Sequence, residues 1–514
     1  MAKDKNKKSK KFQVVKPQTE KGEFHTAVIH FWPDIECLVS LVIIALGFVC
    51  RIALEKKYRL KVISSGSLRI EDWQDEKRVK EAKLDVVRLI EQGRLAQELE
   101  QIGYLFVDCG GGFLDHHGRQ DSLCTIEILT ELVGLKKGYE WFLGIAQVIA
   151  AQDKQGTAIA RDPDYRNSSW PNTARTLRNL ITGWNLLYRN NPLKVVVQCV
   201  YAFKGVFALT QDKAKRTNTA SPDIANENYF LMDPMVAGLK LTKVRKQQRK
   251  EFQDECRLAL DRMEVEWKLA LRDFETAQFR VLDIPQVVFA NGVRWVESKC
   301  VVVAGQSESY RFGSVARMKA NEYAAQRKLT VVETVIIQHR RSDTHFNVSV
   351  GSWTARTKEG SQVHTERDRS KMVLNRVAAA LRAAEIRLSD PDGRAELIDP
   401  LEQVGNVYFD LNGKVLSAIF LAPFKTACGN AWNTNPDMPP CSLTAQDVYV
   451  ITVLTLLGQP FDKSQTCHRQ SSPYCKPSCG WRCFELYGCA RYRQGKAREF
   501  ETRTHPSNGS ERIL

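Results

Sequence analysis

The stretch FVDCGGGFLDHHGR (residues 106–119) decides the fold prediction for this chain. Asp108 closes an apolar run, three glycines allow the chain to turn tightly, and Asp115, His116 and His117 return beside it. Carboxylate and imidazole ligands together suit Mn²⁺, Fe²⁺, Co²⁺ or Zn²⁺, whereas an all-oxygen site would suit Mg²⁺. Any one of these side chains alone is more often a turn cap or a hydrogen-bonded core residue. Four of them at the end of one strand predict a metal site.

Apolar, β-branched runs alternate with helical sequence on both sides of this stretch. Such an alternation predicts an α/β fold with a mostly parallel sheet that carries helices on its faces. Ligands of these folds bind where strands end and helices begin. The predicted strands are FHTAVIHF (24–31), LKVISS (60–65) and YLFVDCG (104–110), and the predicted helices around them are 37–50, 77–103, 122–135 and 139–157.

A second group of ligand-type residues follows the first predicted strand. IHFWPDIEC (29–37) places His30, Asp34 and Glu36 across a strand-to-helix turn. Side chains at such a turn point into the same crevice as those at the end of a neighbouring parallel strand. Asp153 ends a later apolar helical run, a position where a solvated carboxylate is the common alternative.

The ordered set of His-x-x-x-Asp-x-Glu, a strand-ending Asp, Asp-His-His and a later Asp resembles the DHH phosphoesterase superfamily. This resemblance implies a parallel-sheet DHH-type N-terminal domain and two divalent metal ions, Mn²⁺ foremost, with Mg²⁺, Co²⁺ or Zn²⁺ as alternatives. It implies that His30 and Asp34 hold one ion, that Glu36, His116 and Asp153 hold the other, and that Asp108 bridges them. It also implies that Asp115 orients His116 and that His117 faces the phosphate.

The activity implied is hydrolysis of phosphodiester bonds in single-stranded nucleic acid, short oligonucleotides or nucleotides by a two-metal mechanism. The family usually has Asp where Glu36 stands, and the extra methylene moves the carboxylate by more than the tolerance of a metal site unless the backbone compensates. The chain also lacks the Gly-Gly-His loop common in the family, the nearest counterpart being CGNAW (428–432). The alternative is therefore a catalytically degenerate member that binds nucleic acid or a nucleotide without turnover.

The length of the chain predicts several domains. The expected division is a basic, unstructured tail (1–23), a DHH-like domain (24–240), a charge-laced helical connector (241–284), a smaller α/β C-terminal domain (285–457) and a cysteine-rich tail (458–514). The C-terminal domain is expected to contact the substrate through histidines and arginines, because guanidinium groups match phosphate oxygens. The alternative is that these arginines are solvated residues at a strand end. The candidate substrate contacts of the C-terminal domain are His339, Arg340, Arg341, His345 and Arg382.

The last predicted segment concentrates thiols in a stretch too short and polar to bury a core. Zn²⁺ bound by thiolates would supply folding free energy, although the spacing differs from that of common zinc knuckles. An Fe–S cluster and free surface thiols are the alternatives. The candidate ligands are Cys467, Cys475, Cys479, Cys483 and Cys489.

The net charge of +16 and a pI near 9.2 favour polyanionic partners such as nucleic acid. Fourteen cysteines without a secretory signal predict a reducing compartment, the cytoplasm. The apolar run after Glu36 ends at Arg51, which is short of the roughly 20 residues of a membrane span, and therefore predicts a buried helix, with a membrane anchor as the alternative. The oligomeric state is left open, a homodimer included.

Overall fold

The computed structural model divides the chain into two compact units, Met1–Ala259 and Leu260–Leu514, and shows an α/β protein. Each unit is described by itself. The described residues are 23–63, 68, 70–116, 123–155, 175–219, 221–284, 288–290, 293–295, 298–327, 331–339, 346–350, 353–356, 362–366, 377, 381, 407–409, 418–421 and 443–457.

The first unit is built on a three-stranded parallel sheet in the order β2-β1-β3. The strands are β1 (Glu23–His30), β2 (Ala53–Ile63) and β3 (Tyr104–Val107), so the predicted parallel sheet is confirmed. His30 pairs with Ile63 at the end of β2, and Ile29 pairs with Val107 at the end of β3. The register therefore brings His30 and the residue after β3, Asp108, to the same carboxyl edge of the sheet.

Strand β2 begins seven residues before its predicted start at Leu60. Its first half, ALEKKYR, is charged and mostly exposed, because β2 is an edge strand with one neighbour. Charged side chains are common on edge strands, where they oppose edge-to-edge association. The apolar pattern used to predict the strand could not reveal that half.

Helix α1 (Ile35–Leu46) is the predicted buried helix. Its residues from Ile35 to Ile44 are all buried, as expected for a helix that is apolar on every side. Asp34 caps its first turn, and Gly47 ends it with left-handed backbone (φ 57°). Among the described helices, one is long and apolar enough to cross a membrane by length and composition: α11 (Pro192–Thr217), of whose apolar window 61% is buried inside the protein.

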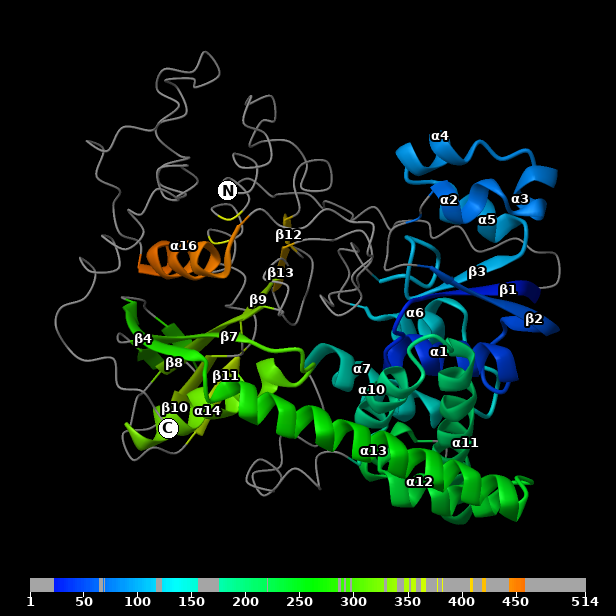
Figure 1. The fold of residues 1–514 in the computed structure, drawn as a ribbon. Helices are drawn as coiled ribbons and strands as arrows, with labels where there is room; N and C mark the ends of the chain where they lie inside the picture. Colours follow the sequence, from blue (N-terminus) through cyan, green and yellow to red (C-terminus); the bar gives the residue numbers. More distant parts are fainter. Residues whose placement is uncertain are drawn as a thin grey trace, which may run out of the picture. The chain divides into compact units, whose positions relative to one another are not determined.

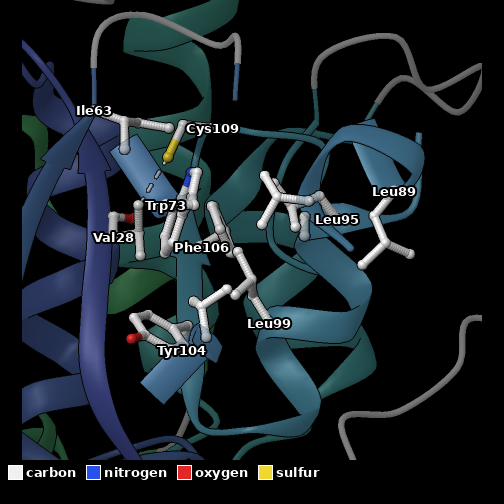
Figure 2. Close-up of a cluster of buried hydrophobic side chains, with 12 residues drawn as sticks. Val28, Ile63, Trp73, Leu89, Leu95, Leu99, Tyr104, Phe106 and Cys109 are labelled. Carbon is white, nitrogen blue, oxygen red and sulfur yellow. Dashed lines mark hydrogen bonds between the residues drawn. The ribbon is translucent and has the colours of Figure 1, made fainter. Parts of the chain in front are cut away.

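Short helices cover one face of the sheet: α2 (Ile70–Gln74), α3 (Lys77–Glu81), α4 (Val86–Glu91) and α5 (Leu95–Gln101). Figure 2 shows Trp73 of α2 against β3, with its ring 5.3 Å from that of Tyr104 and 5.8 Å from that of Phe106. Residues 77–103 were predicted to be helical, and they are mostly helical, but they form separate short helices. Lys83 (φ 54°) and Gly93 (φ 64°) lie in the left-handed region, which ends a right-handed helix.

The other helices of the first unit lie on the opposite side of the sheet from α2–α5 (Figure 1). They include α6 (Thr125–Leu132), α7 (Phe142–Gln155), α10 (Leu177–Leu187), α11, α12 (Met232–Gly238) and the first part of α13 (Lys246–Phe274), with short 3-10 turns at Pro222–Ile224, Glu227–Phe230 and Leu239–Leu241. Helix α13 packs Phe252 against Trp184, with ring centroids 6.1 Å apart. Its last part belongs to the second unit, where Ala270 joins the core.

Helices α11 and α12 pack so closely that one methyl group added at their contact should lower the stability of the protein. A Cβ atom on Gly205 would lie 2.2 Å from the Met235 carbonyl oxygen, and one on Gly238 would lie 2.2 Å from the Gly205 carbonyl oxygen. Because these neighbours are backbone, Gly205→Ala must push the helices apart. We expect it to lower the free energy of unfolding by about 2–3 kcal/mol in urea denaturation. Gly313→Ala, a helical glycine with nothing within 4 Å, is the control, and equal stability of the two variants would refute the packing argument.

The second unit is a mixed β-sheet with helices α14 (Phe312–Gln326) and α16 (Ala445–Leu457). Strands β7 and β8 are parallel, with α14 between them in sequence, and the other pairs are antiparallel. Its strands are β4 (Gln278–Ile284), β7 (Ser298–Gln306), β8 (Val331–His339), β9 (Phe346–Val350), β10 (Trp353–Arg356), β11 (Gln362–Glu366), β12 (Val407–Phe409) and β13 (Ala418–Leu421), and β5 (Val288–Ala290) with β6 (Val293–Trp295) forms a separate hairpin.

Two elements of the second unit differ from the prediction. Strand β4 lies in the segment expected to be a helical connector, and it is a strand because it pairs with β7 along its whole length, from Gln278 with Ala304 to Ile284 with Ser298. Helix α14 was not predicted. Phe312 and Val315 are buried near its start, but the buried residues that follow are Ala316, Ala320 and Ala324, which give a weaker helical pattern than large apolar residues would.

Candidate metal centre

The backbone at the end of β3 is strained in the way that often marks a functional site. Asp108 has left-handed backbone (φ 60°), an uncommon conformation for a residue other than glycine. Gly110 and Gly111 (φ 73° each) then reverse the chain, so that the Asp108 N–H donates to the Leu114 carbonyl oxygen at 3.3 Å. This turn returns Asp115 and His116 to the strand end, as predicted from the three glycines. Strained backbone that persists in a folded protein is held by its surroundings and recurs at ligand sites.

The two carboxylate oxygens of Asp108 face different histidines. His30 Nε2 lies 3.6 Å from Oδ2, and His116 Nδ1 lies 3.0 Å from Oδ1. Asp108 is 1% exposed and His30 is 4% exposed, so both sit in the interior at the sheet edge. Asp108 is the residue to which the resemblance assigns the bridging position.

Among the described residues, two groups of side chains could each hold a metal ion, and Asp108 belongs to both. One group is His30, Cys37 and Asp108, and the other is Glu36, Asp108 and His116. Within each group the ligand atoms all lie within 4.8 Å of one another. The structure therefore brings together four of the predicted metal ligands and adds Cys37, which the sequence analysis did not select.

Helix α6 begins against the second group. The Ile126 N–H donates to Glu36 Oε1 at 3.0 Å, and the Thr125 hydroxyl donates to Asp108 Oδ1 at 2.8 Å. The N-terminus of a helix favours negative charge, so this placement stabilises two buried carboxylates. The capping box formed by Cys124 and Glu127 marks the start of this helix and was the available sequence signal for it.

Thr125 contacts the candidate site, although the sequence analysis did not select it. Its hydroxyl also lies 3.2 Å from His116 Nδ1, so one buried side chain contacts both a carboxylate and an imidazole of the site. We expect Thr125→Val to lower Mn²⁺ affinity by about 10–100-fold, as loss of a hydrogen bond to a ligand commonly does. Isothermal titration measures this change. The control is Thr130→Val in the same helix, whose hydroxyl bonds to the Glu127 carbonyl oxygen, and an equal loss in the control would contradict the role of Thr125.

Asp34 lies outside both groups, unlike the metal-ligand role that the resemblance implies. Its Oδ1 accepts the Cys37 N–H at 2.9 Å, and the residue is exposed. This is the ordinary N-cap bond of a helix, and it turns the carboxylate toward the first turn of α1. The difference arises because the strand-to-helix turn of this chain starts the helix directly after Asp34.

Asp115 and Glu100 hold the glycine turn from two sides. Asp115 Oδ2 accepts the Gly111 N–H at 2.6 Å, whereas the expected role for Asp115 is to orient His116. The Glu100 carboxyl accepts the Phe113 N–H, with distances of 2.9 and 3.2 Å to its two oxygens. Burial raises the pKa of Glu100 to about 8, and the charge of Asp115 adds to the rise. Sequence reasoning did not select Glu100, because a glutamate in a charged helical stretch looks like a solvated one.

The structure describes only part of the remaining predicted site residues. Asp153 is in α7, which packs against α1 and α6, but its side chain lies outside the described part of the structure. His339 ends β8 in the second unit, and its carbonyl oxygen accepts the Ser307 N–H at 2.9 Å. The predicted residues that lie outside the described ranges are His117, Arg340, Arg341, His345, Arg382, Cys467, Cys475, Cys479, Cys483 and Cys489, together with nearly all of the basic tail.

The donor set fits divalent metal ions. Buried carboxylates and imidazoles are ligands that suit Mn²⁺, Fe²⁺, Co²⁺ and Zn²⁺. Glu36 is fully buried although it carries one more methylene than the aspartate that the resemblance implies at this position, and its Oε2 lies 3.7 Å from His116 Nδ1. The longer side chain therefore still reaches the group that contains Asp108.

No protein-family model matches this chain, and no curated protein sequence matches it.

Proposed function

We propose that this protein is a metal-dependent phosphoesterase of the DHH type that hydrolyses phosphodiester bonds in single-stranded nucleic acid, short oligonucleotides or nucleotides. The observation that carries the proposal is Asp108, whose two oxygens face two ligand groups at the carboxyl edge of a parallel sheet. That edge is where ligands of α/β folds bind. The net charge of +16 supports a polyanionic substrate.

Each residue of the site has a distinct part in this proposal. Asp108 holds both metal positions in a fixed relation, while His30 on one side and Glu36 with His116 on the other complete them. Thr125 fixes the Asp108 carboxylate, and the N-terminus of α6 fixes Glu36. Two divalent ions held in this way would supply positive charge for a phosphoryl group and lower the pKa of a water molecule.

A second candidate function is binding of nucleic acid or a nucleotide without hydrolysis. The observation that favours it is the position of Asp34, which caps α1 instead of joining either ligand group. A centre with fewer carboxylate ligands holds its ions less tightly, so a single ion or none would remain bound at equilibrium. Such a protein would keep the fold and the positive charge that attract the polyanion.

The test is hydrolysis by the metal-stripped full chain after metal is returned. Substrates are a single-stranded DNA, an oligoribonucleotide, a dinucleotide and pyrophosphate, each with Mn²⁺ and with chelator. We expect cleavage of at least one phosphodiester, faster with Mn²⁺ by ~10³-fold or more, because several kcal/mol of transition-state stabilisation depend on the ions. No cleavage of any substrate by protein that binds two Mn²⁺ ions per chain would refute the proposal and leave the binding function.

A further inference from the structure

Cys37 is the third member of the His30 group, for which the resemblance implies Asp34 as a ligand. Its Sγ lies within 4.8 Å of the ligand atoms of His30 and Asp108, and the residue is fully buried. The thiol donates to the Val107 carbonyl oxygen at 3.4 Å, which places it beside the last residue of β3. It is therefore part of a cluster formed by the ends of β1 and β3 and the first turn of α1.

We infer that Cys37 is a metal ligand, and that the His30 side of the centre is a His-Cys-Asp site selective for a thiophilic ion, Zn²⁺, over Mn²⁺ or Mg²⁺. This inference rests on the proposed metal centre and adds the identity of one ion. Thiolate ligands favour Zn²⁺, whereas Mn²⁺ and Mg²⁺ prefer oxygen. The Glu36 side of the centre offers carboxylates and an imidazole, so the two positions differ in chemistry.

Burial raises the pKa of the Cys37 thiol to about 12, so a bound cation is what would stabilise the thiolate here. Cys37 lies in the first turn of α1, where its N–H bonds to the Asp34 cap, and a helix N-terminus favours an anionic sulfur. Binding is written as Cys–SH plus M²⁺ giving a Cys–S–M bond and a proton, which is released to solvent. The Val107 carbonyl oxygen then loses its S–H donor, which is the local cost of binding.

Cobalt substitution reads out the thiolate independently of activity, because a cysteine sulfur bound to Co²⁺ gives a near-ultraviolet charge-transfer band. Three full-length proteins are stripped of metal and titrated with Co²⁺: the wild type, Cys37→Ser and Cys109→Ser. Cys109 is the matched control, since it is equally buried. Its thiol donates to the carbonyl oxygen of Val28 in β1 at 3.5 Å, much as the Cys37 thiol donates to Val107 in β3. We expect Cys37→Ser alone to lose band intensity, and any band from other thiols stays in all three spectra.

Metal affinity supplies a second readout. Cys37→Ser should weaken Zn²⁺ binding by ~10-fold or more while changing Mn²⁺ binding less. Loss of a residue that only hydrogen-bonds to a ligand already lowers metal affinity by about 10–100-fold, and loss of a ligand itself should lower it at least as much. Cys37→Asp returns an anionic ligand and should shift the preference toward Mn²⁺. Identical Co²⁺ spectra of the Cys37→Ser and Cys109→Ser proteins, with the ion bound, would overturn this inference and leave the phosphoesterase proposal intact. No Co²⁺ or Mn²⁺ binding at all would overturn both.

Discussion

Asp108→Asn is expected to abolish hydrolysis, with a fall in kcat of ~10³-fold or more, because the one carboxylate shared by both ligand groups becomes a neutral amide. Asparagine is the informative replacement. It tolerates the left-handed backbone that Asp108 adopts (φ 60°), and its side-chain oxygen can still accept the Thr125 hydroxyl. The variant should fold, and it should lose both metal ions rather than one.

Metal content and activity are measured together for this variant. The control is Asp75→Asn, an exposed aspartate of the same unit that pairs with Lys80 at 3.2 Å, which should leave both unchanged. An Asp108→Asn protein that keeps two ions per chain would show that Asp108 does not bridge them. Retained activity would show that hydrolysis occurs elsewhere.

Glu100→Gln is expected to stabilise the protein at pH 8 by roughly 3–5 kcal/mol and to have little effect at pH 5. Burial raises the pKa of Glu100 to about 8, while an unfolded glutamate titrates near its usual 4.5. Between these values the folded chain keeps a proton that the unfolded chain releases, so the stability of the wild type falls as the pH rises through this window. Glutamine cannot ionise, and its side-chain oxygen still accepts the Phe113 N–H.

Urea unfolding at pH 5, 6, 7 and 8 measures this prediction. Glu91→Gln, on an exposed position of the neighbouring helix α4, is the control and should show no such trend. A constant difference between Glu100→Gln and wild type across these pH values would mean that Glu100 does not titrate in the window. The support that it gives to the glycine turn would then be a simple hydrogen bond.

The parallel sheet and most of the metal centre could be predicted because their determinants are local in sequence. Apolar runs gave β1 and β3, and the ligand-type residues follow these strands directly, so His30, Glu36, Asp108 and His116 were within reach. Cys37 and Thr125 were not, since a buried thiol and a threonine at a helix start are ordinary residues until their neighbours are known. Asp34 shows the converse: the sequence places it correctly at the turn, but the helix cap uses its carboxylate.

The second unit was harder to predict for a different reason. Strand β4 is specified by its antiparallel pairing with β7 and not by its own alternation, and α14 packs small residues that give a weak helical pattern. Non-local pairing of this kind cannot be read from a single segment. The α/β class was predicted correctly, because it depends on the strands and helices that have strong local patterns.

The most direct test of the central claim is a crystal structure of the full chain soaked with both Mn²⁺ and Zn²⁺ and measured at the manganese and the zinc absorption edges, with the peaks at the two edges counted together. We predict two anomalous peaks about 3.5–4 Å apart, one on each side of the Asp108 carboxylate, with His30 beside one and His116 beside the other. A single peak, or none within bonding distance of Asp108, would contradict the dinuclear centre on which the proposed function depends.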